Sequence, residues 1–333
     1  MKKYSIFFLI TILAITGCEK VSTPANEAAD WTLLASVKAV GNGLGLQDMC
    51  LSDQNTLWLV GQTNYCIKST DGGITWQDFV VDPLATSQWH WYAINFPTPQ
   101  IGYIVGGSII YKTINGGTSW VKVFDRANGN LSAARCINFI TPDKGFVCSS
   151  FGILFRTTDG GKTWTDQTIS SLGSNVTLEK IVFIDELHGW ISGTMGTLLK
   201  TTDGGNTWNI IHSNADVTLS LYKYGSPDIA VISQNELFTT NGSLLKSSDA
   251  GTTWTDSEGI LNQGMNLTMK DRDEAFCLVK PGSMAHTYDG GKTWTLFTLN
   301  TYGSLVGYFV KYGHTLYGYN QGDNKVYKYN KPW

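Results

Sequence analysis

From about residue 30 onward, short apolar runs alternate with polar turn signals, and one block of this pattern recurs along the chain. It is clearest as an apolar run (Ile181–Phe183), a Gly-aromatic-apolar run (His188–Gly193) and a third run that leads into a turn closed by Trp208. Short runs of this kind bounded by turn residues are typical of β-strands. Because a further strand begins at each closing tryptophan, the pattern predicts four strands per block and an all-β protein.

The turn after the third strand occurs six times, as Ser/Thr-x-Asp/Asn-x-Gly-x-Thr/Ser-Trp. Its tryptophans are spaced by 44, 44, 44, 46 and 40 residues, which indicates a repeat architecture. The Asp closes the turn by accepting backbone hydrogen bonds, glycine takes positive φ, and tryptophan anchors the next strand. Six copies of one turn cannot all be one active site, so we interpret them as structural: Asp71, Trp76, Asn115, Trp120, Asp159, Trp164, Asp203, Trp208, Asp249, Trp254, Asp289 and Trp294.

This turn resembles the Asp-box, or BNR, repeat of sialidase-like β-propellers. The whole block, as seen in residues 181–208, is similar to the repeat of the photosystem II stability/assembly factor family, and the resemblance covers nearly all of the chain after its leader. It implies a propeller that grips another protein during maturation of a membrane complex. That family has an arginine-rich patch on its binding surface, whereas this chain has four arginines: Arg126, Arg135, Arg156 and Arg272.

The two ends of the chain predict a seventh block. Trp31 lies 45 residues before Trp76, in phase with the repeat, although no Asp box precedes it. The segment 301–333 has room for three strands (Gly303–Val310, Thr315–Tyr319 and Lys325–Asn330) but no closing Asp box. Pairing Trp31–Ser36 with these strands would close a ring and remove exposed sheet edges. We therefore predict a single seven-bladed propeller over 31–333, with six blades and stray ends as the alternative.

Residues 1–17 have the features of a leader. Lys2 and Lys3 precede an apolar run too short to span a bilayer, and Ile15-Thr16-Gly17-Cys18 resembles the bacterial lipobox. The expectation is a lipoprotein signal peptide, lipidation at Cys18, a flexible tether over 18–30, and attachment to a bacterial membrane at the cell envelope. An ordinary signal peptide followed by a chance cysteine is the alternative.

Composition narrows the classes of partner and cofactor. Net charge is −3 and only 15% of residues are charged, without a basic stripe, so a nucleic-acid partner is not expected. The cysteines lack CxxC spacing and the histidines lack metal-ligand spacing, so no metal or cofactor is expected. Cys136 and Cys148 fall on neighbouring strands where a disulfide could form, whereas a third strand separates Cys50 from Cys66. Buried free thiols are the default interpretation for all five cysteines after Cys18.

A basic residue also recurs eight positions before each tryptophan. A ring of cations could bind an anion, but a solvated or turn-pairing position of the repeat is the favoured interpretation. The six positions are Lys68, Lys112, Arg156, Lys200, Lys246 and His286.

Function is sought where the repeats differ, on the face formed by the loops between blades. The irregular loop from Asp82 to Tyr92 places Trp89, His90 and Trp91 together, which suits a protein hot spot or stacking on a sugar. The alternative is that one or both tryptophans pack into the blade. Arg126 and Arg135 lie near the corresponding loop of the third blade, and Arg135 is expected to form an inter-blade ion pair with Glu179. In the fifth blade, Ser233 to Gly242 is predicted to be a long loop over the same face.

The chain lacks the signatures of the enzymes built on this repeat. Sialidases need three arginines for a carboxylate, and Arg156 already occupies a repeat position; the Arg-Ile-Pro motif is absent. Glycosidases need two convergent acids, and nothing in the sequence pairs Asp82, Asp125, Glu179 or Asp216. We predict a non-catalytic, lipid-anchored, monomeric scaffold that binds an envelope protein or glycan, with a carbohydrate-binding protein or glycoside hydrolase as the alternative.

Overall fold

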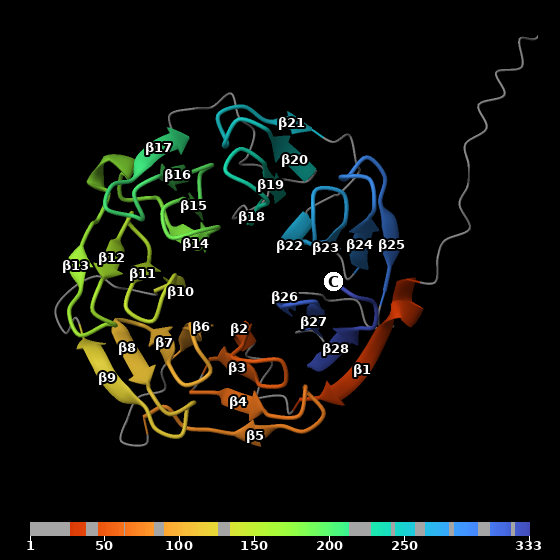
Figure 1. The fold of residues 1–333 in the computed structure, drawn as a ribbon, viewed down its shortest axis with the longest axis horizontal. Helices are drawn as coiled ribbons and strands as arrows, with labels where there is room; N and C mark the ends of the chain where they lie inside the picture. The colour runs from red at the N-terminus through yellow and green to blue at the C-terminus, as the bar shows by residue number, and fades with distance from the viewer. Residues whose placement is uncertain are drawn as a thin grey trace, which may run out of the picture.

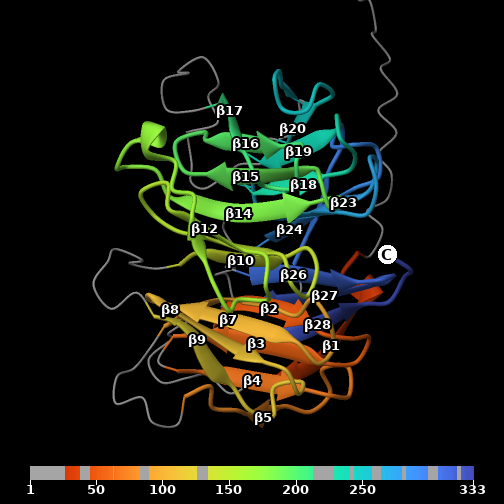
Figure 2. The same ribbon diagram turned by 60° about the vertical axis from the view of Figure 1, so that its left-hand side comes forward.

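The computed structural model describes residues 27–37, 46–62, 64–82, 90–125, 134–212, 228–240, 244–256, 264–279, 283–298, 307–320 and 324–333. Within them, seven four-stranded antiparallel sheets are arranged as blades around a central axis (Figure 1). In blades I to VI the first strand is innermost, and successive strands stack outward, as β14 to β17 do in Figure 2. The predicted all-β, seven-bladed propeller is confirmed.

Blades I to VI take their four strands in chain order. They are β2 (Leu46–Leu51), β3 (Leu57–Gly61), β4 (Cys66–Ser69) and β5 (Gln77–Asp78) in blade I; β6 (Trp91–Asn95), β7 (Gly102–Gly106), β8 (Ile109–Thr113) and β9 (Val121–Asp125) in II; β10 (Cys136–Phe139), β11 (Gly145–Cys148), β12 (Leu154–Thr157) and β13 (Thr165–Asp166) in III; β14 (Leu178–Phe183), β15 (Gly189–Gly193), β16 (Leu198–Thr201) and β17 (Asn209–His212) in IV; β18 (Ile229–Val231), β19 (Leu237–Thr240), β20 (Leu244–Ser247) and β21 (Thr255–Asp256) in V; and β22 (Gly264–Met269), β23 (Ala275–Val279), β24 (Ser283–Thr287) and β25 (Thr295–Phe297) in VI.

Blade VII is built from both ends of the chain, as the tryptophan phase predicts. Its inner strands are β26 (Gly307–Tyr312), β27 (Thr315–Asn320) and β28 (Lys325–Tyr329), and its outer strand is β1 (Trp31–Ser36). β1 runs antiparallel to β28, with Trp31 opposite Tyr329, so the red and dark blue strands lie side by side in Figure 1. The short 3₁₀ helix η1 (Glu27–Asp30) precedes β1 in the segment predicted to be tether.

Hydrogen bonds within each Asp box close its turn. In blade I, the Asp71 carboxylate accepts from the Thr75 amide at 2.9 Å and the Thr75 hydroxyl at 2.6 Å, while the Ser69 hydroxyl accepts from the Gly73 amide. Gly73 has a φ of 91°, which favours glycine. Asp159, Asp203, Asp249 and Asp289 repeat this arrangement. In blade II, Asn115 replaces it by accepting from the Ser119 amide and donating to the Ser119 hydroxyl.

The Asp boxes make the stability of the propeller depend on pH in the acid range. Hydrogen bonds, first from the threonine hydroxyl four residues on, lower the pKa of Asp71, Asp159, Asp203 and Asp249 to about 2. Unfolded aspartate titrates near its usual pKa of about 3.9. This contribution to stability is therefore fully present above about pH 4 and lost as pH falls towards 2. Circular dichroism should show the melting temperature falling steeply over that window. Replacing these four Asp residues by Asn, as blade II does naturally, should flatten the curve; an unchanged slope would contradict the assignment.

Five of the six repeated basic side chains lie over aromatic rings, and two of them, Lys68 and Lys112, also link neighbouring blades. Lys68 lies over the Trp58 ring at 4.4 Å and donates to the Gly116 carbonyl of the next blade at 2.9 Å. Lys112 does the same over Tyr103, donating to Gly160. Lys200 and Lys246 lie over the rings of Trp190 and Phe238, and His286 stacks on Phe276. The bonds of Lys68 and Lys112 to turn carbonyls agree with the turn-pairing interpretation.

Removing one of these ammonium groups should destabilise the packing between neighbouring blades. Lys112→Met keeps the alkyl stem over Tyr103 but loses the charged hydrogen bond to Gly160, which is worth about 1.5–3 kcal/mol. We expect the free energy of unfolding, from urea denaturation, to fall by that amount. Lys122→Met is the matched control, because Lys122 is exposed and its salt bridge is with Asp125 on its own strand. Equal losses in the two variants would contradict an inter-blade role.

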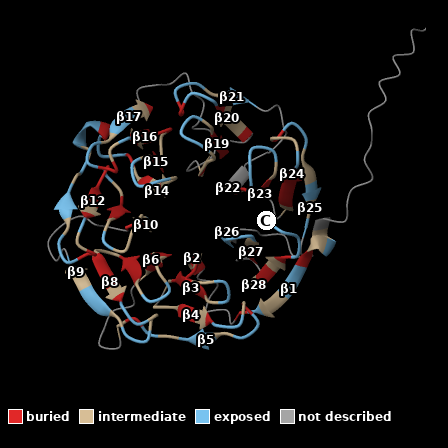
Figure 3. Cartoon of the chain, viewed as in Figure 1, coloured by how far each residue is buried: buried red, intermediate tan, exposed pale blue. Residues whose placement is uncertain are grey.

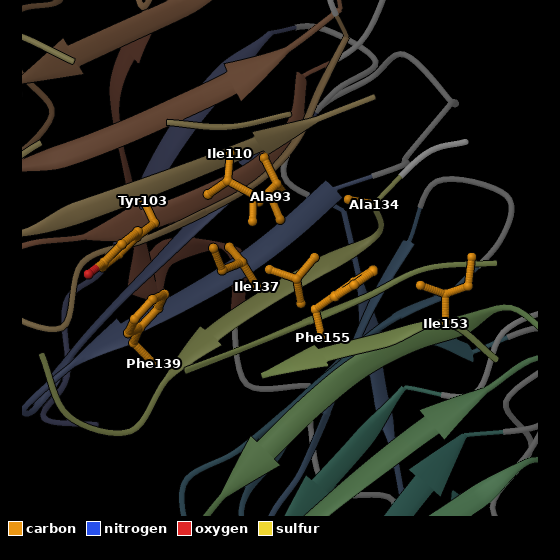
Figure 4. Packing of buried hydrophobic residues seen from close by; sticks show 10 residues of the cluster. Ala93, Tyr103, Ile110, Ala134, Ile137, Phe139, Ile153 and Phe155 are labelled. Carbon is orange, nitrogen blue, oxygen red and sulfur yellow. The ribbon is translucent and has the colours of Figure 1, made fainter. Parts of the chain in front are cut away.

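The core lies between the blades. In Figure 4, Tyr103 of blade II stacks against Phe139 of blade III, with ring centres 3.7 Å apart, and Ile137 and Phe155 continue this layer. Figure 3 shows burial concentrated on middle strands such as β3 and exposure on outer strands such as β9. Each blade therefore buries its apolar faces against its two neighbours.

Cys136 and Cys148 are paired across β10 and β11, which confirms their predicted shared register, and both thiols are free. The three remaining cysteines of the described residues, Cys50, Cys66 and Cys277, are likewise not in disulfides, and Cys66 and Cys277 are buried. Among the described residues, no helix has the length and apolarity needed to cross a membrane.

The prediction for blade V is wrong. Residues 233–236 form the turn between its first two strands, and Leu237–Thr240 is strand β19. The Ile232 amide donates to the Glu236 carbonyl, and the Ala250 amide of the Asp box donates to Asn235. The turn therefore lies on the Asp-box side of the ring. The inner strand β18 has only three residues and gives a weak strand signal, so the sequence pattern shifts the strand assignment of this blade by one.

Candidate functional site

The propeller has two different faces. The turns between first and second strands lie beside the Asp boxes, as the hydrogen bonds from Gly116 to Gln100 and from Gly160 to Asp143 show. We call this side the turn face. The opposite side, where the chain passes between blades and between second and third strands, is the loop face. Of the predicted binding residues that the structure describes, His90 and Arg135 lie just before the inner strands β6 and β10, at the loop-face end of their blades.

An irregularity at the loop-face end of the inner strands positions the candidate site. The register of β6 against β7 shifts between Trp91 and Ala93, and that of β14 against β15 shifts between Leu178 and Lys180. In blade III, Arg135 precedes β10, and its amide donates to the Cys148 carbonyl. Tyr92, Arg135 and Glu179 thus occupy one repeat position on three consecutive blades. A β-bulge re-aims a side chain in this way.

Tyr92 and Arg135 form the centre of the site. The guanidinium carbon of Arg135 lies 5.4 Å from the centre of the Tyr92 ring, a cation–π distance. The centre of the His90 ring lies 6.3 Å from the centre of the Tyr92 ring. The guanidinium fork and the two rings are partly exposed, which leaves donors and ring faces for a ligand.

Glu179 is the third member of this row. Burial raises the pKa of its carboxyl, and the positive charge of Arg135 acts in the opposite direction. The attraction expected between these two side chains across the blade boundary is therefore present as a Coulombic interaction.

The structure separates the predicted aromatic residues. Trp91 is fully buried and packs edge-on against Tyr111, so its ring belongs to the blade core, the alternative that the sequence left open. A Cβ on Gly106 would lie 2.4 Å from the His90 carbonyl, so glycine allows this close approach. Trp89, Arg126 and Cys18 lie outside the described residues.

A charged layer beneath the site was missed from the sequence. The Asp48 carboxylate accepts from the amides of Met49 and, in the next blade, Ile94. Asp228 accepts from the Leu267 amide of its next blade and from the Lys180 ammonium. Burial raises the pKa of Asp48 to about 7, against the backbone hydrogen bonds and the charge of Lys180. The sequence signal for this layer is a charged residue, such as Asp48, at one repeat position of an otherwise apolar strand.

This arrangement favours binding chemistry. Asp48 and Asp228 each direct an oxygen to a backbone amide of the next blade, and Lys180 is paired with Asp228. In the part of the chain that the structure describes, no group of three or more His, Cys, Asp and Glu could hold a metal ion. The exposed Arg135 fork beside aromatic rings instead suits a protein or other polar ligand.

Comparison with known proteins identifies relatives of the whole propeller. A model of the family "Photosynthesis system II assembly factor YCF48" matches residues 23–128 and 130–259. The "Photosystem II assembly lipoprotein Ycf48" of Nostoc sp. (strain PCC 7120) is 33% identical over 96 residues, a match that spans 28% of this chain and 27% of that protein.

Two solved structures have the same fold. "YCF48 bound to D1 peptide" has 18% sequence identity and a TM-score of 0.68, covering 91% of this chain and 97% of that one. "YCF48 from Cyanidioschyzon merolae" has 17% identity and a TM-score of 0.69, covering 90% and 98%. At this identity, the likeness supports the propeller fold alone.

Proposed function

This chain belongs to the Photosynthesis system II assembly factor YCF48 family, and we propose that it is a non-catalytic scaffold that binds a protein segment during assembly of a membrane complex. The observation that carries the proposal is the Tyr92–Arg135 pair at the loop face. One solved family member, of the same fold, is bound to a D1 peptide. A propeller fold by itself hosts many activities, so the proposal depends on this site.

The chemistry of the pair suits a peptide ligand. Tyrosine and arginine are among the residues that dominate protein–protein affinity, because each combines a large contact area with hydrogen-bonding groups. The Arg135 fork can donate hydrogen bonds to a carboxylate or backbone carbonyl, and the half-buried Glu179 restricts which charge can approach beside it. An extended segment with a hydrogen-bond acceptor next to an apolar side chain would satisfy both the Arg135 donors and the Tyr92 ring.

We further propose that the scaffold is lipid-anchored at Cys18 in the cell envelope. The lipobox-like sequence before Cys18 supports this, and the Nostoc relative is itself named a lipoprotein. One acyl-bearing cysteine would keep an otherwise water-exposed propeller beside its membrane partner.

Affinity capture from envelope extracts, run together with a glycan array, tests the class of ligand. The full chain should retain a protein and no glycan, and a Tyr92→Ala/Arg135→Ala variant should lose that protein while keeping its melting temperature. Specific glycan binding without a protein would favour the carbohydrate alternative. Hydrolysis of a bound glycan would contradict the non-catalytic proposal.

A further inference from the structure

The start and end of the propeller lie on its turn face. β26 ends at Tyr312 and turns through Gly313 and His314 into β27, so this turn marks that face in blade VII. The Trp333 amide donates to the His314 carbonyl, which places the C-terminus there. The Asn330 amide donates to Asp30, and Lys331 pairs with the Asp30 carboxylate. η1 therefore joins the chain to the turn face.

Chain length limits how far the anchor can lie from this point. The backbone between Cys18 and Glu27 can reach at most about 30 Å at 3.3–3.6 Å per residue. Crossing from the turn face to the loop face along a five-residue strand would use about 17 Å of it. The path from Cys18 to the turn face is the shorter of the two. We therefore expect the turn face to be directed towards the membrane.

Exposed apolar side chains gather on the same part of the turn face. Ile74 is 62% exposed and Ile114 is 70% exposed in the Asp boxes of blades I and II. Tyr288, 52% exposed, occupies the position of Ile114 in blade VI, and Tyr312 is 39% exposed in blade VII. These four residues, which we call the apolar arc, lie on the consecutive blades VI, VII, I and II. The arc is centred on the blade where the tether joins (Figure 1).

We propose that the turn face docks on the lipid bilayer through the apolar arc, leaving the loop face and the Tyr92–Arg135 pair directed away from the membrane. The proposal rests on the proposed lipid anchor. Isoleucine side chains would enter the interface, where the amphipathic ring of tyrosine is also favoured. The turn face also bears Asp71 and Asp289, so we expect apolar contact with neutral lipid and no requirement for anionic lipid.

Hydroxyl-radical footprinting of the full lipidated chain on phosphatidylcholine vesicles tests this orientation with native side chains. The reference is the Cys18→Ser chain in solution. Modification of Tyr288 and Tyr312 should fall several-fold on vesicles, whereas Phe151, 44% exposed at the second-to-third-strand turn of the loop face, should be unchanged. Unprotected tyrosines, or protection of Phe151 instead, would overturn the proposal.

Two variants and one mass measurement distinguish the contribution of the apolar arc from that of the lipid anchor. Ile74→Asp/Ile114→Asp should abolish the protection, whereas Leu187→Asp should keep it, because Leu187 is equally exposed on the turn face but lies in blade IV, outside the arc. Protection that survives in the double variant would overturn the role of the arc. An intact mass without lipid at Cys18 would refute the anchor and this inference together. A lipidated chain without protection would refute the inference alone.

Discussion

Gly117→Ala is expected to lower the free energy of unfolding by roughly 3–4 kcal/mol, combining backbone strain with overpacking. Gly117 has a φ of 79° in the Asp box of blade II, and a Cβ there would lie 2.1 Å from the Trp58 ring of blade I. Trp58 is fully buried, stacks on Phe96 with centres 4.6 Å apart, and donates its indole N–H to Ser52. The ring has no room to move aside.

Gly313→Ala is the matched control for this prediction. Gly313 also has a positive φ, 57°, but no heavy atom lies within 4 Å of its would-be Cβ. Its substitution should cost only the backbone strain, about 1 kcal/mol. Urea denaturation of both variants measures the difference. If Gly117→Ala costs no more than Gly313→Ala, the close contact between Asp box and neighbouring blade does not contribute to stability.

Arg135→Ala is expected to weaken binding of the captured protein partner about 30-fold, the effect of truncating a hot-spot residue worth about 2 kcal/mol. Arg135 is exposed, and its guanidinium lies over the Tyr92 ring, so the two side chains present one surface to a ligand. Titration of the purified partner against the variant, for example by calorimetry, gives the change in Kd.

The control and a double-mutant cycle sharpen this prediction. Arg272→Ala removes an exposed arginine from the turn face, where it pairs with Glu236, and should leave partner affinity unchanged. If Tyr92 and Arg135 bind as a unit, the Tyr92→Ala/Arg135→Ala loss should be smaller than the sum of the single losses. A 30-fold loss in Arg272→Ala, or none in Arg135→Ala, would move the binding site away from the loop face.

The fold could be predicted from the sequence because its signals are local. An Asp box closes its turn with side chains four residues apart, such as Asp71 and Thr75, so each copy is visible in the sequence. The in-phase Trp31 also predicted the closure of blade VII, which β1 and β28 confirm. Neither inference needs knowledge of a neighbouring blade.

The site could be predicted only in part because its geometry is set between blades. The bulge at Tyr92 decides that Trp91 points into the core, and no local pattern in Trp89-His90-Trp91-Tyr92 marks that bulge. Asp48 binds the Ile94 amide 46 residues away, and Lys180 pairs with Asp228 across the boundary between blades IV and V. Such contacts depend on how neighbouring blades are positioned relative to each other, and the periodicity of the strands does not determine this.

Site-specific photo-crosslinking in intact cells tests the central claim most directly, that the loop face grips a protein. A photoreactive phenylalanine analogue would replace Tyr92 on the loop face and, in a second strain, the exposed Lys162 in the Asp box of blade III on the turn face. We expect a discrete protein adduct from position 92, lost on Arg135→Ala, and none from position 162. An adduct from position 162 alone, or the absence of any protein adduct from position 92, would contradict the account.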